Sequence, residues 1–104
     1  MRRIINVMEE LLIPPVAKED PNAQEVLRAW AAHQGLHISL NVDAWNDPAT
    51  WGIFLADILR HIALAYEQAY AVSREDIAKT IVRIFKSELE MPTDEPEGTI
   101  TRCH

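Results

Sequence analysis

The strongest pattern of apolar and polar positions in this chain is helical and lies between residues 47 and 71. Apolar side chains recur there every three or four residues, which is the spacing of one face of an α-helix. Asp47 is suited to cap the first turn, and Pro48 fits the first helical position because its missing N–H is not needed there. We therefore predict a long central helix. Its apolar arc is wider than one neighbouring helix can cover, so we expect it to be buried from two sides.

A second helix follows directly. Ser73 is expected to cap it, with Asp76 three residues later in the position of a capping box, and Pro92 is expected to stop it. Its predicted apolar stripe consists of Ile77, Ile81, Ile84, Phe85 and Leu89.

Residues 24–42 show the alternation of a β-hairpin. In the second half, LHISLNV, every other side chain is apolar, and Gly35 can supply the positive φ of a tight loop. The first half, QEVLRAWA, fits two registers. A four-residue loop, 32–35, places Leu27 opposite Leu40 and Trp30 opposite His37. A three-residue loop with a glycine bulge places Trp30 opposite Ile38 instead. We favour the first register, because it keeps Arg28 away from the core.

These elements predict an α+β fold of order β-β-α-α in a single domain over residues 24–91. Residues 1–23 form an N-terminal arm and residues 92–104 a flexible tail. In the arm, Ile4–Val7 could be a strand, or Ile4, Met8, Leu11 and Leu12 could line a short helix, and Pro14-Pro15 is expected to end either element.

Length and charge narrow the class of protein. A chain of 104 residues has room for one domain, and its net charge of -6 argues against binding to nucleic acid or to an anionic membrane. Charged residues interrupt the central apolar run, which argues against a membrane span. The single cysteine, Cys103, excludes an intrachain disulfide. The apolar run at the N-terminus is too short for a signal peptide, so we expect a cytoplasmic protein.

The hairpin predicts self-association. Two strands alone are marginal in water and leave unpaired edges, and the outer face would carry Val26, Trp30 and His37. We expect a homodimer, in which two copies pair their strands or stack their sheets. The alternative is that the N-terminal arm folds back as a third strand.

Three segments, EVLRAW, GLHISL and DPATWGIFLADILRHIA, resemble a family of small bacterial proteins known only as a domain of unknown function. The likeness covers about residues 22–90. It implies a bacterial origin and a compact α+β unit. It implies no activity, so no catalytic residue is carried over.

Motifs for phosphate loops, dinucleotides, zinc and nucleophile elbows are absent from the sequence. His33 and His37 flank the hairpin turn, and Asp57 and His61 share one helical stripe, but a solvated stripe is the better interpretation and we predict no metal or other cofactor. A second group shares the outer face of the hairpin and could be a recognition patch or, as we favour, the dimer contact: Arg28, Trp30, His37 and Ser39.

Two functions follow from these patterns. The first, which we favour, is a homodimeric interaction or assembly module that could also bind another protein. The second is a small-molecule-binding domain or small enzyme with a pocket between the hairpin and the central helix. Its mouth would carry His37, Asp57, Arg60 and His61. The lack of a catalytic constellation leans against an enzyme.

Overall fold

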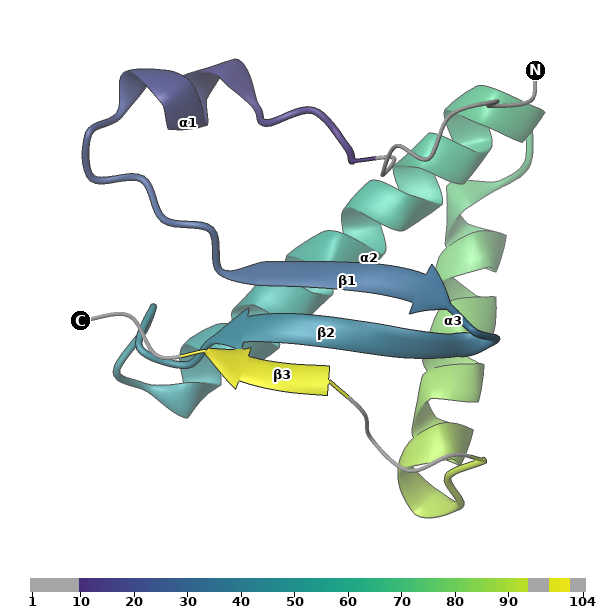
Figure 1. The fold of residues 1–104 in the computed structure, drawn as a ribbon. Helices are drawn as coiled ribbons and strands as arrows, with labels where there is room; N and C mark the ends of the chain where they lie inside the picture. The colour runs from purple at the N-terminus through teal and green to yellow at the C-terminus, as the bar shows by residue number, and fades with distance from the viewer. Residues whose placement is uncertain (1–9, 94–97, 102–104) are drawn as a thin grey trace.

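A computed structural model describes residues 10–93 and 98–101 of the chain. The chain has an α+β fold in which a two-stranded hairpin is followed by two long helices, as predicted. Both helices lie on one side of the sheet, joined at one end and spread apart at the other (Figure 1). In chain order the elements are α1 (Pro15–Glu19), β1 (Leu27–Ala32), β2 (Gly35–Asn41), α2 (Pro48–Tyr70), α3 (Arg74–Glu90) and β3 (Gly98–Thr101).

The hairpin has the favoured register. Leu27 lies opposite Leu40 and Trp30 opposite His37, and the pairing runs without a bulge. One face therefore carries only apolar side chains, from Leu27 to Ala31 on β1 and from Leu36 to Leu40 on β2. The other face carries Arg28 and Trp30. The apolar face is not the more covered of the two, since Leu36 on it is 56% exposed while Arg28 and Trp30 on the other face are half-buried.

The turn of the hairpin corrects our expectation. Pairing continues to Ala32 and Gly35, so the loop has two residues instead of four. The positive φ values fall on His33 (49°) and Gln34 (60°), while Gly35 is the first residue of β2. Positive φ at both central positions is the mark of a type I′ turn, whose twist matches that of the strands. The twist of the hairpin thus outweighs the cost of placing two residues with side chains in the left-handed region.

A third strand, β3, runs parallel to β2, with Ile38 beside Gly98 and Asn41 beside Thr101. The sequence pattern did not predict it, because we expected a flexible tail there and an edge covered by a second copy or by the N-terminal arm. The strand order is β1-β2-β3, so β1 is an edge strand. Residues 10–93 and 98–101 contain no strand that pairs with its outer edge. Ile4–Val7 and Met8 lie outside the residues that the structure describes, whereas Leu11 and Leu12, which the helical alternative also included, lie in a stretch without regular secondary structure.

The helices begin as their caps predict. The Asp47 carboxylate accepts a hydrogen bond from the Ala49 N–H (2.9 Å), and Pro48 is the first residue of α2. Helix α2 ends at Ala71, which has φ 57° and a left-handed conformation. In the arm, Pro15 starts helix α1 instead of ending an element. The physical reason is the same as at Pro48, since a proline at the first position loses no intrahelical hydrogen bond.

The buried core of the described chain is small. Ala63 on α2, 3% exposed, is its buried apolar residue, and Asn41 at the end of β2 is its buried polar one. Three aromatic rings, Trp45, Trp51 and Phe54, pack against one another at the start of α2 with centroids 4.8 to 5.5 Å apart. None of the described helices combines the length and the apolar character needed to cross a membrane.

Candidate functional site

The four residues of the predicted patch do come together. Arg28 lies opposite Ser39 and Trp30 opposite His37, which puts all four side chains on one face of the hairpin. Two hydrogen bonds to carboxylates position the Arg28 side chain: its guanidinium donates to Glu25 (3.2 Å) and to Glu10 (2.6 Å). The hydrogen bond to Glu25, with the charge of that carboxylate and the bond to Glu10, raises the pKa of Arg28 above its ordinary value. Two carboxylates thus neutralise the cation that was expected to recognise a partner.

A hollow of about 820 Å³ lies at one end of the hairpin. It is lined by residues 23–28, 39–41 and Asp43, and therefore by the approach to β1 and the end of β2. Its floor contains Asn41, 4% exposed, whose amide donates to Gln24 Oε1 (3.1 Å) and accepts from the Asp43 N–H (3.1 Å). No residue of α2 lines it. It is therefore not the pocket between hairpin and central helix that the second function requires.

The polar residues expected at the mouth of such a pocket lie apart from this hollow. Arg60 donates to the Asp57 carboxylate (3.1 Å), and a ring nitrogen of His61 lies 2.8 Å from the Asp57 carbonyl oxygen. All three side chains are exposed along α2. His33 sits in the hairpin turn. Within the described ranges no group of three or more His, Cys, Asp or Glu residues could hold a metal ion.

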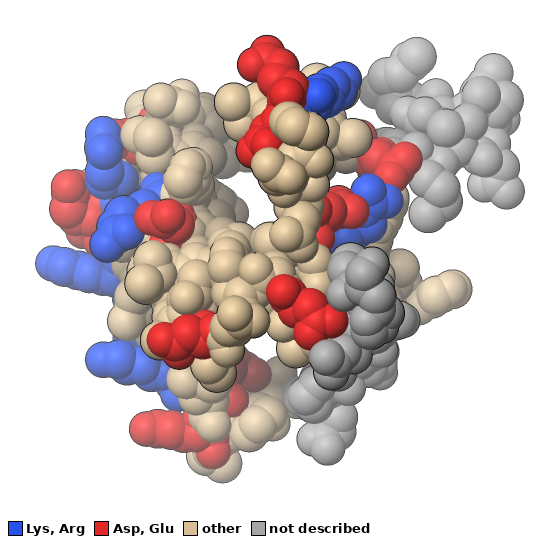
Figure 2. Space-filling view, turned by 90° about the vertical axis from the view of Figure 1, so that its left-hand side faces the viewer, with Lys and Arg blue, Asp and Glu red and all other residues tan. Residues whose placement is uncertain are grey.

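A second hollow, of about 480 Å³, lies on α3. Its lining combines the stems of three exposed cations with two half-buried apolar residues: Lys79, Arg83, Lys86, Ala78 and Val82. Figure 2 shows several Lys and Arg side chains projecting along one border of the molecule, with acidic side chains interspersed among them. Mixed charge of this kind is typical of a solvated helix face.

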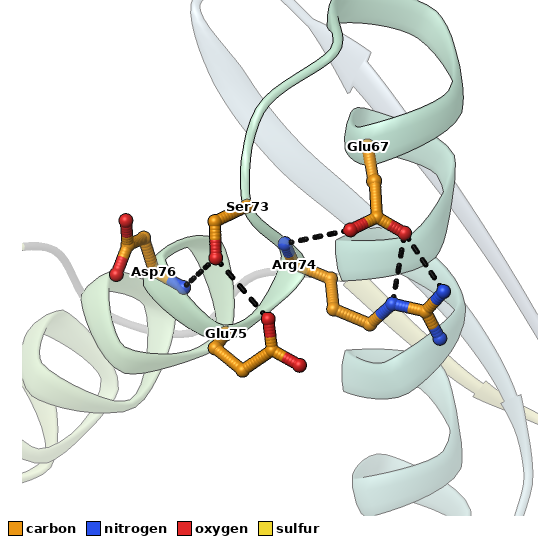
Figure 3. A network of polar contacts seen from close by, with 5 residues as sticks. All are labelled: Glu67, Ser73, Arg74, Glu75 and Asp76. Atoms are coloured by element: carbon orange, nitrogen blue, oxygen red, sulfur yellow. Dashed lines mark hydrogen bonds and ion pairs between the residues drawn. The ribbon is translucent and has the colours of Figure 1, made fainter.

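A polar clamp joins the two helices where they meet. The Arg74 side chain donates to Glu67 through Nε (2.9 Å), and its backbone N–H donates to the same carboxylate (3.3 Å) (Figure 3). The hydrogen bond from the Arg74 side chain, aided by that from its backbone, lowers the pKa of Glu67. Ser73 accepts from the Asp76 N–H (3.3 Å), as the predicted cap requires, and its hydroxyl donates to Glu75 (3.2 Å). These contacts fix where α3 begins relative to α2.

The sequence pattern did not reveal how many apolar side chains on the helices stay uncovered. We expected them to be buried, yet large apolar residues are exposed along α2 and toward the end of α3: Leu55, Ile62, Tyr66, Tyr70, Ile84, Phe85 and Leu89. The spread of the two helices in Figure 1 explains the second half of this set, because α3 moves away from α2 after its first turns. The over-wide apolar arc of residues 47–71 was the one signal of this surface.

Comparison with known proteins identifies relatives without an established activity. A solved structure from the photosynthetic bacterium Rhodopseudomonas palustrus CGA009, described as a presumed pyruvate dehydrogenase, is similar with a TM-score of 0.73. It is 33% identical in sequence, and the alignment covers 96% of this chain and 100% of that one. Among curated proteins the search found no match.

The profile of one family, described as domain of unknown function DUF5076, matches residues 10–93. The match includes all three segments on which the resemblance was based, and it begins earlier than residue 22, within the arm. The chain therefore belongs to the DUF5076 family, a domain of unknown function.

Proposed function

We propose that this protein is an assembly module that acts as a homodimer, and that its helices supply most of the contact. The observation that carries the proposal is the exposed apolar surface on α2 and α3. Soluble monomers seldom leave contiguous apolar patches of this kind in water, and such patches most often mark protein contacts. The Arg28 face of the hairpin, which we first favoured as the contact, is the weaker candidate because its cation is already paired.

Surface area supports the same conclusion. The whole chain exposes 9594 Å², whereas a compact monomer of its mass would expose about 5,900 Å². Its radius of gyration is 16.2 Å, against about 13 Å for a compact domain of this length. One partner in a standard interface loses roughly 800 Å². The chain is therefore more open than a compact monomer of its length.

The test is the mass of the native protein in solution. We expect sedimentation equilibrium or light scattering to give the mass of two 11.8 kDa chains at micromolar concentration. A mass of one chain over the whole accessible concentration range would overturn the proposal. A stable dimer of this kind should also dissociate and unfold together, so its melting temperature should rise with protein concentration.

The hollow at the end of the hairpin supports a second candidate, a site for a small molecule. Its volume of about 820 Å³ lies within the usual range of ligand sites, and polar groups of Ser39, Asn41 and Asp43 line it. Pyruvate is the first compound to test, because the solved relative is named after an enzyme of pyruvate. A ligand at 100 times its Kd adds roughly 2.7 kcal/mol of stability, so a thermal-shift titration decides. An unchanged melting temperature in saturating pyruvate would remove that ligand.

A further inference from the structure

The exposed apolar stripe of α2 lies in a concave part of the fold, between elements that cover the helix on either side. At 3.6 residues per turn, Leu55, Ile62 and Tyr66 fall on one line along the helix, and all three are exposed. Between residues 54 and 63 the positions on both sides of this line are half-buried or buried, whereas Ala65, Ala69 and Tyr70 beside Tyr66 are exposed. One flank is formed by Trp51, Phe54 and Ile58, and the other by Leu59, Ala63 and Glu67.

Different parts of the fold cover the two flanks. Trp51 and Phe54 pack on Trp45, in the loop after β2. Glu67 binds Arg74 at the start of α3. An exposed line between two covered flanks is the inside of an angle, which a narrow apolar segment can fill. We call this surface the helix corner and define it by Leu55, Ile62 and Tyr66 of α2 and by Ile84 and Phe85, which lie on the side of α3 that also carries its half-buried residues.

The chain also contains an apolar segment with nothing against it. Leu11 and Leu12 in the arm are 96% and 95% exposed, and Ile13 is more than half exposed. Pro14, which follows, has φ -56° and ψ 138°, an extended polyproline conformation. A residue before proline is itself restricted to extended conformations. Ile13 is therefore restricted before the segment binds, which lowers the entropy lost on docking at that residue.

The chain's own arm is held away from its own helix corner. Glu10, the residue before Leu11, binds Arg28 at 2.6 Å. Leu11 and Leu12 are almost fully exposed while this pair is formed, so they do not fill the helix corner of their own copy.

We propose that the segment 11–13 of one copy fills the helix corner of a second copy, and that the exchange is reciprocal. The inference rests on the proposed function, since it requires a homodimer, and it names the contact. A two-fold axis makes such a contact self-consistent, because each copy offers one arm and one corner. The contact places Leu11 and Leu12, the most exposed of the described large apolar side chains, against an uncovered apolar surface on the helices.

Crosslinking tests the contact directly. Leu12 is replaced by the photoreactive p-benzoylphenylalanine, and equal amounts of ¹⁴N- and ¹⁵N-labelled protein are mixed and allowed to exchange before irradiation. We expect crosslinks from position 12 to peptides that contain residues 55–66 or 84–85, with mixed-isotope pairs among them. The matched control carries the same group at Ile53, an exposed apolar residue on the polar side of α2, and should give few such pairs.

A pair of charge variants gives a second readout. Leu11→Asp with Leu12→Asp should raise the Kd of the dimer by about a hundredfold or more, the effect of losing interface hot spots. Ile53→Asp should change it less than about threefold, as expected outside the contact. Because Leu11 and Leu12 are almost fully exposed, the monomer fold should survive, which circular dichroism checks.

The outcomes separate the two proposals. A dimer whose crosslinks join residues of the same chain, or reach another part of the partner, would overturn the arm exchange and leave the homodimer standing. An unchanged Kd in the double aspartate variant would also overturn the exchange. A monomeric parent protein would remove both.

Discussion

The sheet and the pair of helices differ in how fully their polar side chains are paired and their apolar side chains are covered. On the sheet side, Arg28 has two carboxylate partners, Asn41 is buried with its amide bonded, and β3 covers one edge. On the helix side, the polar contacts between α2 and α3 lie at their meeting point, and apolar side chains stay exposed beyond it. The exposed apolar surface on which our proposed dimer rests is therefore on the helix side.

The comparison is tested most directly by substituting residues on one side of the molecule at a time. Tyr66→Lys places an unpaired charge in the helix corner and should raise the Kd of the dimer by about a hundredfold, as for a hot-spot residue. Trp30→Ala on the hairpin should raise it by less than about tenfold. Sedimentation equilibrium measures both. The reverse order of effects would place the contact on the Arg28 face and contradict the helix surface.

A smaller effect is expected where α3 begins. Ser73→Ala removes the side chain that accepts from the Asp76 N–H, and loss of such a cap typically costs about 1 kcal/mol of unfolding free energy. Ser39→Ala, an exposed serine on the sheet, is the matched control and should cost less than about 0.5 kcal/mol. Urea denaturation of both variants at one protein concentration measures the difference. Equal losses of unfolding free energy in the two variants would show that the Ser73 cap does not stabilise the start of α3.

The smallest effect on stability is expected at low pH, where Glu67 becomes protonated. Its pKa is lowered in the folded protein by the hydrogen bonds from Arg74. The ionised form is therefore the one that stabilises the fold. This stabilisation is complete above the ordinary carboxyl pKa and is lost as the pH falls through the lowered value. Glu67→Gln should slightly lower the melting temperature at neutral pH and flatten its decrease in acid.

Salt provides the control for that experiment. The pair is near the surface, so high ionic strength should reduce the difference between Glu67→Gln and the parent protein. A pH profile that is the same in both proteins would mean that the Glu67–Arg74 clamp does not contribute to stability.

Local chemistry was enough to predict much of the fold. The bounds of α2, its Asp47 cap, the Ser73 cap and the register of the hairpin depend on residues close together in sequence, and each was predicted. The candidate patch was also placed on one face correctly, because a strand alternates its side chains regardless of what surrounds it. Its role as a site stays a prediction.

The features that escaped prediction depend on distant parts of the chain. The twist of the paired strands selects the two-residue turn at His33 and Gln34. Strand β3 is four residues long and owes its existence to an edge of β2 some sixty positions earlier.

The exposure of Ile62 and Tyr66 has the same origin. The sequence by itself determines that these side chains are apolar and share a helical face, because the period of the helix is a local property. Only the tertiary structure decides that they stay uncovered, because the cover depends on the angle between α2 and α3. The same holds for Leu11 and Leu12, whose place depends on the ion pair between Glu10 and Arg28.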